Sequence, residues 1–245
     1  MDWLFTGEIM LVTIGAVVIV IIGSIVQGSL GIGLGFIAVP LLALLDQDFI
    51  PGPLLLAALL LTVLVSYREY DSIVFKEINW AITGRILGTA VGAATLIMIP
   101  ENKLAVLFGI MVLSAVGMSL LGFRLKVSPR NLVLTGILSG FMGTTSAIGG
   151  VPMALIYQDL QGPKLRGTLS AIFVAGTLLS IISLIIIGRF GGRQIILALE
   201  LIPGILIGYF ISNRTAKILD RGYIRLLILG LAGLSGLVIL FRGLS

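Results

Sequence analysis

The chain has 245 residues, of which 58% are hydrophobic and 11% are charged, and its formal net charge is +5. A soluble domain is about a quarter charged and a transmembrane helix needs about 20 mainly apolar residues, so these proportions exclude a soluble enzyme and leave room for roughly eight to ten membrane segments. Histidine and cysteine are both absent, which excludes disulfides, thiolate or imidazole metal sites and histidine-based catalysis.

The N-terminal segment is predicted to be a retained membrane helix. Residues 1–8 include Asp2 and Glu8 and contain no lysine or arginine, whereas a signal peptide begins with basic residues. The apolar run at 9–26 that follows is long enough to span a membrane.

Two interrupted apolar segments divide the chain. The first, 9–45, is broken by the glycine-rich string 28–35, and the second, 129–157, is broken by 143–150. Three uninterrupted apolar segments follow each of them, and the charged clusters at 68–77 and 214–225 are expected to be solvated or lipid-facing loop residues. The predicted single spans are 54–67, 80–99 and 104–121 in the first half and 168–188, 195–212 and 226–241 in the second.

The two halves of the chain repeat one another. Four positions have a glycine or proline counterpart 112 residues later, at the same place in the hydropathy pattern. This spacing predicts a duplication, with one repeat at 1–121 and the other at 122–245, within a single membrane domain. The matched pairs are Gly28 with Gly140, Gly31 with Gly143, Pro40 with Pro152 and Pro51 with Pro163.

The distribution of lysine and arginine favours hairpins over single crossings, because these residues mark cytoplasmic loops. If each interrupted segment crosses the membrane once, the two sides hold eight and seven basic residues. If each segment returns, four lie on one side and eleven on the other. We therefore expect two hairpins and inverted repeats, with full crossing and mid-membrane re-entry both open. Both termini and 46–53 are then non-cytoplasmic, and 122–130 is cytoplasmic.

The two glycine-rich tips are the strongest candidates for a substrate site. Irregular backbone at membrane depth is tolerated where it lines a cavity, and a restarted helix aims free amides and its positive dipole end at the tip. We expect an anion to bind there without lysine or arginine; tight helix packing by small residues is the alternative. The predicted substrate-binding residues are Gln27, Gly28, Ser29, Gly31, Gly33, Ser139, Gly140, Gly143, Thr144, Thr145, Ser146 and Gly149.

Arg85 and Glu200 lie inside predicted spans. Ionisable residues in membrane segments are costly and mark functional sites, although both lie near a helix end and Arg85 could extend to the membrane surface instead. Glu200 is the one carboxylate embedded in a predicted span, so it is the candidate proton carrier. We assign both residues to coupling, with H⁺ as the coupling ion.

The string Gln27-Gly-x-x-Gly-x-Gly-x-Gly-Phe-x-x-x-Pro40 and its counterpart from Ser139 to Pro152 resemble the TauE/SafE family of membrane transporters, the sulfite exporter or toluene-sulfonate uptake permease family. The resemblance covers essentially the whole chain. The usual first motif has consecutive glycines, which Ile32 and Leu34 interrupt here. The resemblance implies proton-coupled transport of small sulfur-containing oxyanions, organic sulfonates or carboxylates.

These observations together predict an all-α polytopic membrane protein of two inverted repeats, each a broken-helix hairpin followed by three transmembrane helices. We expect a secondary transporter that moves a small anion across the cytoplasmic membrane by alternating access. An anion channel or passive pore is the alternative, but channels favour a continuous polar pore and polarity here is concentrated at two tips. No enzyme activity, metal, cofactor or nucleic acid is expected. The partners are the substrate, the bilayer and H⁺, and a homodimer stays open.

Overall fold

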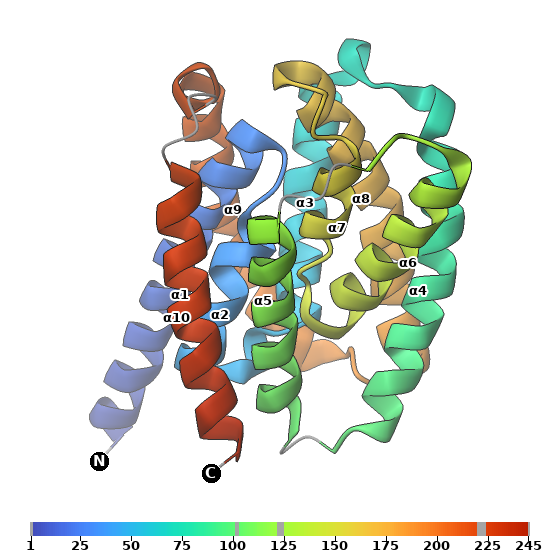
Figure 1. Ribbon diagram of the computed structural model, residues 1–245. Helices are drawn as coiled ribbons and strands as arrows, with labels where there is room; N and C mark the ends of the chain where they lie inside the picture. The colour runs from blue at the N-terminus through green and yellow to red at the C-terminus, as the bar shows by residue number, and fades with distance from the viewer. Residues whose placement is uncertain (1, 101–102, 122–124, 220–223, 245) are drawn as a thin grey trace.

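A computed structural model describes residues 2–100, 103–121, 125–219 and 224–244, with side chains described outside 2–9, 217–219 and 224–228. The described chain forms ten α-helices and three short 3-10 helices, with no strand (Figure 1). The predicted all-helical fold is thereby confirmed. The helices are α1 (Asp2–Leu30), α2 (Leu34–Leu45), α3 (Gly52–Arg68), α4 (Ile78–Met98), α5 (Leu104–Leu121), α6 (Pro129–Ser146), α7 (Gly150–Ile156), α8 (Gly162–Ile186), α9 (Gly192–Leu219) and α10 (Ile224–Leu244).

Five of the described helices are long and apolar enough to cross a membrane: α1, α4, α5, α8 and α9. Helices α2, α3 and α10 contain shorter apolar stretches. Large apolar side chains such as Ile86, Val91 and Ile196 are exposed on the outside of the bundle. Such a surface suits contact with the apolar chains of lipids. An all-helical structure suits this setting, because a helix satisfies its backbone hydrogen bonds internally.

The first interrupted segment is a pair of helices, α1 and α2, that contact one another. The break between them is shorter than predicted, because α1 continues through Gly28 and Ser29 to Leu30. Only residues 31–33 lie outside the two helices. Gly31 and Gly33 have φ angles of 86° and 140°, which glycine adopts readily, so these two residues end the first helix and set the direction of the second.

The second interrupted segment is the helix pair α6 and α7. Helix α6 continues into the predicted break as far as Ser146, and Ala147 then adopts a left-handed conformation with φ of 60°. Helix α7 is only seven residues long. The hairpin formed by α1 and α2 opens toward the end of the bundle where both chain termini lie, whereas the hairpin formed by α6 and α7 opens toward the opposite end (Figure 1).

Glycines allow close helix contacts at two of the predicted site positions. A Cβ atom on Gly28 of α1 would collide with the side chain of Ser212 in α9, and one on Gly140 of α6 would collide with the backbone of Arg85 in α4. The small-residue packing that the sequence left as an alternative is therefore what the structure has at Gly28 and Gly140. A buried apolar cluster drawn from both halves, which includes Leu34, Phe108 and Ile148, fills the centre of the bundle.

Candidate functional site

The two hairpin tips meet inside the bundle. Gly35, in the first turn of α2, lies so close to the carbonyl group of Ala147 that a Cβ atom would collide with it. On the other side of this contact, the Cβ position of Gly150 would be 3.5 Å from Cγ2 of Ile32. The tips are 112 residues or more apart in the sequence, so their contact is made by the fold and fixes one hairpin against the other.

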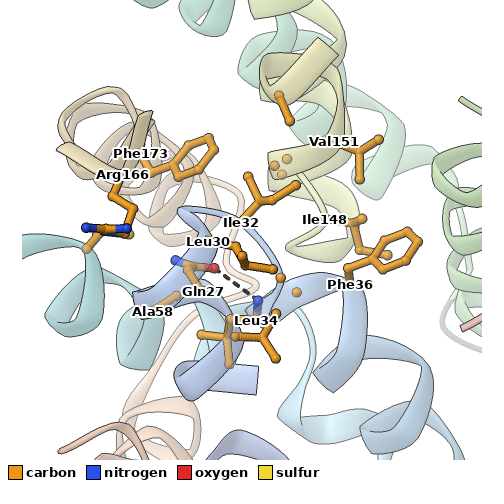
Figure 2. Close-up of a pocket in the computed structure, with 18 of the residues that line it drawn as sticks. Gln27, Leu30, Ile32, Leu34, Phe36, Ala58, Ile148, Val151, Arg166 and Phe173 are labelled. Atoms are coloured by element: carbon orange, nitrogen blue, oxygen red, sulfur yellow. Dashed lines mark hydrogen bonds between the residues drawn. The ribbon is translucent and has the colours of Figure 1, made fainter. Parts of the chain in front are cut away.

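A cavity of about 520 Å³ lies beside this contact, and residues of both hairpins and of α3, α4 and α8 line it (Figure 2). Six of the predicted site and coupling residues line the cavity: Gln27, Ser29, Gly33, Arg85, Gly143 and Gly149. Eight others are not among its lining residues: Gly28, Gly31, Ser139, Gly140, Thr144, Thr145, Ser146 and Glu200.

The cavity reaches the end of the bundle opposite the termini. Its lining includes Gln158 and Gln161 from the connection between α7 and α8, and Ser119 from the last turn of α5. Figure 1 shows these segments at the end away from the start of α1 and the end of α10. No lining residue comes from the connections 46–51 or 187–191 at the other end. Among the connections between helices, those that contribute to the lining therefore lie at one end of the bundle.

Arg85 places a guanidinium group in the wall of the cavity. The residue is only 2% exposed, so it does not extend to the membrane surface as the alternative reading proposed. Its Nη1 donates a hydrogen bond of 2.7 Å to the hydroxyl of Ser139, which in turn donates one of 2.6 Å to the carbonyl oxygen of Gly149. The guanidinium carbon lies 5.5 Å from the ring centre of Phe173, and the absence of a side chain at Gly176 makes room for it.

The charge of Arg85 is unneutralised within the described part of the chain. Its Nε has no hydrogen-bond partner there, and none of the ion pairs between described residues includes it. A buried charge without a partner is unfavourable by several kcal/mol, so an anion in the cavity would supply the missing counter-charge. The sequence predicted an anion site without lysine or arginine; Arg85 lines this cavity, so an anion bound here would also have a guanidinium group beside it.

The hydroxyl groups predicted as substrate donors are engaged elsewhere. Thr145 donates to the carbonyl oxygen of Phe141 at 2.8 Å, and Ser146 donates to that of Met142 at 2.9 Å. The hydroxyl of Thr144 lies 2.8 Å from that of Ser180 in α8. Bonds to the carbonyl four residues back are a common alternative for such side chains in helices. In this conformation the hydroxyls of Thr145 and Ser146 are bonded within α6, and that of Thr144 joins α6 to α8.

Gln27 caps the restarted helix α2. Its side-chain oxygen accepts a hydrogen bond of 3.1 Å from the backbone N–H of Leu34, the first residue of that helix (Figure 2). One of the amides expected to face an anion is therefore already satisfied. Helix α7 is only seven residues long. The N-terminal ends of α2 and α7 therefore provide less positive charge at this site than predicted, and Arg85 is its main positive charge.

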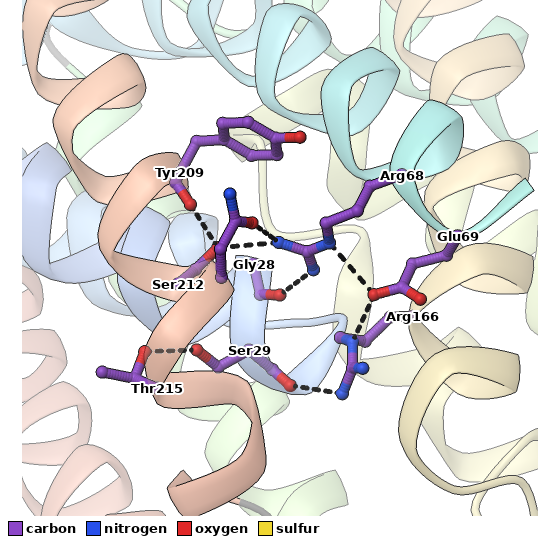
Figure 3. A network of polar contacts seen from close by, with 9 residues as sticks. Gly28, Ser29, Arg68, Glu69, Arg166, Tyr209, Ser212 and Thr215 are labelled. Atoms are coloured by element: carbon purple, nitrogen blue, oxygen red, sulfur yellow. Dashed lines mark hydrogen bonds and ion pairs between the residues drawn. The ribbon is translucent and has the colours of Figure 1, made fainter.

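A polar network that the sequence did not predict lies beside the cavity mouth (Figure 3). Glu69 accepts hydrogen bonds of 3.0 Å from Nε of Arg68 and from Nε of Arg166. The side chains of Arg68 and Glu69 are only 18% and 11% exposed, so this part of the cluster 68–77 is not the solvated loop that was expected. Arg166 also lines the cavity.

The two arginines of this network also bind the carbonyl end of α1. Nη2 of Arg68 donates to the carbonyl oxygen of Gly28 at 2.6 Å, and Nη1 of Arg166 donates to that of Ser29 at 3.2 Å. Cations at this position match the negative end of the helix dipole. Arg68 also donates to the side chains of Ser212 and Asn213 in α9. The network therefore joins α1, α3, α8 and α9.

Glu200 lies away from the cavity, in the contact between α1 and α9. Its Oε2 accepts a hydrogen bond of 2.9 Å from the hydroxyl of Thr13. The bond is partly buried, and any influence of Glu200 on the cavity would be indirect, through α1 or through α9 itself. Among the residues that the structure describes, no group of three or more acidic side chains is arranged to hold a metal ion.

Comparison with known proteins gives one match. The sequence model of the family described as sulfite exporter TauE/SafE matches residues 15–239. No curated protein and no solved structure matches the chain. The matched range includes both hairpin tips, Arg85 and the network of Arg68, Glu69 and Arg166.

Proposed function

The chain belongs to the sulfite exporter TauE/SafE family of membrane transporters, and from this membership we propose that it is a secondary transporter that carries one small anion by alternating access. The proposed substrate site is the cavity at the hairpin tips. The proposal rests above all on Arg85, a buried cation in the cavity wall without an acidic partner among the described residues. Charge-assisted hydrogen bonds from a guanidinium group to an oxyanion are among the strongest in proteins. The remaining predicted residues that line the cavity, Gln27, Ser29, Gly33, Gly143 and Gly149, form its polar and backbone surface.

An inverted-repeat architecture, with repeats at 1–121 and 122–245, is part of this proposal. Helix contacts support it, because they are reciprocal between the halves: α4 packs on α6 as α9 packs on α1, and α3 contacts α9 as α8 contacts α4. Helices α3 and α8, which would be equivalent, contact each other, as do α5 and α10. The two hairpins open toward opposite ends of the bundle (Figure 1). Transporters with inverted repeats bind substrate where the repeats meet.

The orientation follows from the charge rule. If 122–130 is cytoplasmic, as the excess of basic residues on that side predicts, the cavity in this conformation opens to the cytoplasm. The opposite, non-cytoplasmic end is closed by apolar packing that includes Phe49, Leu42 and Leu54. Transport then requires a second conformation, in which the mouth beside Arg166 closes and this apolar end opens.

Proton coupling through Glu200 is also proposed. Protonation of this carboxylate would change its hydrogen bond with Thr13 of α1, and α1 carries both the first hairpin tip and the carbonyl groups bound by Arg68 and Arg166. The effect on the site would therefore be indirect. Glu200→Gln is expected to abolish dependence on a pH gradient while substrate exchange continues.

The experiment that tests the main proposal is counterflow in proteoliposomes with labelled sulfite. Arg85→Gln should abolish exchange and Arg85→Lys should retain a small part of it. Arg193→Gln is the matched control, because Arg193 forms an exposed ion pair with Asp48 far from the cavity lining. A channel would give uptake without acceleration by substrate on the opposite side. Unchanged exchange in a folded Arg85→Gln variant would refute the proposed site.

A further inference from the structure

We propose that the anion leaves the cavity along the contact between α4 and α8, and that three hydroxyl groups form its next binding position after Arg85. These hydroxyls, which we call the hydroxyl cluster, belong to Thr89 of α4, Thr144 of α6 and Ser180 of α8. The cluster would bind the anion in the second conformation, in which the protein opens at the end that holds both termini. This inference rests on the proposed function, because it extends the transport path of the same site.

The hydroxyl cluster lies directly beside the guanidinium group of Arg85. The hydroxyl of Thr144 is 2.8 Å from that of Ser180 and 3.2 Å from that of Thr89. Ser180 also donates to the carbonyl oxygen of Gly176 at 3.0 Å, and the guanidinium group lies against this same glycine. The three side chains are no more than 3% exposed. A continuous buried polar surface therefore leads from the cation to the hydroxyl cluster.

Two leucines lie beyond the cluster on the same helices. Arg85, Thr89 and Leu96 are spaced by four and then seven residues along α4, which places them on one face of the helix. On α8, Leu184 follows Ser180 by four residues. Both helices run toward the end that holds the termini (Figure 1), and they contact one another. Because both leucines are buried in the central apolar cluster, they close this path in the present conformation.

Another arginine lies at the far end of this contact. Arg189, which follows α8, donates from Nη2 to the carbonyl oxygens of Leu96 and Ile99 at 3.1 and 3.2 Å. A cation at this position matches the negative end of the α4 dipole. The contact between α4 and α8 therefore has an arginine at each end, the hydroxyl cluster after the first arginine and a short apolar segment before the second. An anion that moves along it has a positive charge near both ends.

The alternative role for these hydroxyls is to hold helices together, since hydrogen bonds between helices stabilise their packing in membranes. The position of Thr144 favours a role in transport as well. It lies near the end of α6, at the hairpin tip, next to Gly143 of the cavity lining. Hydroxyl groups rotate to suit a partner, so movement of the tip would free them to donate to an oxyanion. As neutral donors they bind an anion less strongly than a guanidinium group, which favours onward release.

The first test compares sulfite binding with sulfite exchange in Thr89→Val and Ser180→Ala, which remove a hydroxyl with little change in volume. Calorimetry should give dissociation constants close to that of the parent, because Arg85 is kept. The maximum rate of counterflow should fall roughly tenfold or more, the loss expected when one hydrogen bond to a charged group is removed. Ser180→Thr keeps the hydroxyl and should retain most of the rate. Thr95→Val is the matched control, because Thr95 bonds to the carbonyl oxygen of Val91 on the exposed side of α4.

The second test measures access to the path, which helix packing alone would not provide. The chain has no cysteine, so Leu184→Cys introduces a single thiol beyond the hydroxyl cluster. An impermeant methanethiosulfonate reagent should label it from the side on which the connection 46–51 lies, and an anionic reagent should react faster than a cationic one. Val112→Cys is the control, because Val112 is equally buried but packs against Gly236 of α10; it should stay unlabelled.

The outcomes separate this inference from the proposed function. Unchanged exchange in Thr89→Val and Ser180→Ala would overturn the hydroxyl cluster as a binding position, and so would loss of sulfite binding itself, which would assign the hydroxyls to the present cavity. An unreactive Leu184→Cys would overturn the path between α4 and α8. In each case, loss of exchange in Arg85→Gln would still support the substrate site. If Ser180→Ala does not fold, Thr89→Val decides. Exchange retained in Arg85→Gln would overturn both the site and the path.

Discussion

Arg85 of α4 donates a 2.7 Å hydrogen bond to the hydroxyl of Ser139 in α6, which joins a helix of the first half of the chain to the hairpin of the second. The same hydroxyl donates to the carbonyl oxygen of Gly149 at the hairpin tip. The cation is thus held by the tip beside which the substrate is proposed to bind, so movement of this hairpin would carry the charge with it.

Ser139→Ala should weaken anion binding, because it removes the bond that orients the Arg85 guanidinium group. Hydrogen bonds to charged groups contribute about 1.5–3 kcal/mol, which corresponds to roughly 10- to 150-fold in affinity. Calorimetric titration with the anion, compared between the parent and the variant, checks this prediction. Ser139→Thr keeps the hydroxyl and should restore most of the affinity; equal weakening in both variants would argue for a packing defect instead.

Gly176→Ala should displace Arg85 from the cavity wall, because the added Cβ atom would overlap the guanidinium group. Alanine favours a helix over glycine by about 1 kcal/mol, so α8 itself should remain folded. We expect anion binding to be lost while circular dichroism stays unchanged. Gly117→Ala is the matched control, since no atom lies within 4 Å of a Cβ at that helical position. Normal binding by Gly176→Ala would contradict the position assigned to Arg85.

Glu69→Gln should lower the stability of the protein, because it leaves Arg68 and Arg166 without the carboxylate that they share. The loss should be about 1–3 kcal/mol, the range for a buried polar group that loses its partner. Thermal unfolding in detergent measures it. Asp48→Asn removes the exposed partner of Arg193 and should change stability little. Equal effects of the two substitutions would show that the network adds nothing beyond an ordinary surface ion pair.

Single cysteines at Asp48 and Ser128 should be labelled from opposite sides of the membrane. The chain has no cysteine of its own, so each introduced thiol reports one position. The expected result is labelling of Asp48→Cys from outside the cell and of Ser128→Cys from the cytoplasm, as the charge distribution predicts. An impermeant thiol reagent applied to intact cells and to inverted vesicles makes the measurement. Reaction of both cysteines from the same side would exclude the proposed topology.

The positions of the two hairpins could be predicted from the sequence because glycine strings interrupt long apolar runs at matched places. The exact ends of the helices could not. Helix α1 continues through Gly28 and Ser29, and α6 continues to Ser146, because a helix is the simplest way to satisfy backbone groups at membrane depth and small residues do not prevent it. Only a left-handed residue, Gly31 or Ala147, ends each one.

The orientation of Arg85 could not be predicted from its sequence position, because it lies near the start of a span where a long side chain can reach the surface. One signal was present. Gly84 and Gly88 are four residues apart, and both lie against the backbone of α6, which marks a protein-facing side of α4 next to Arg85. The role of Arg68 and Glu69 was hidden for another reason: their partners, Gly28 and Arg166, are distant in the sequence and come close only in the fold.

The capping of α1 by two arginines has a consequence for ions of the opposite sign. The free carbonyl groups at a helix end inside a membrane are natural ligands for Na⁺ or K⁺, but those of Gly28 and Ser29 already accept hydrogen bonds from Arg68 and Arg166. Arg166 and Arg85 both line the cavity, and Arg68 shares the carboxylate of Glu69 with Arg166. An inorganic cation in the cavity would be repelled by Arg85 and would find these carbonyl groups already occupied, so we expect this helix end to contribute to selection against cations.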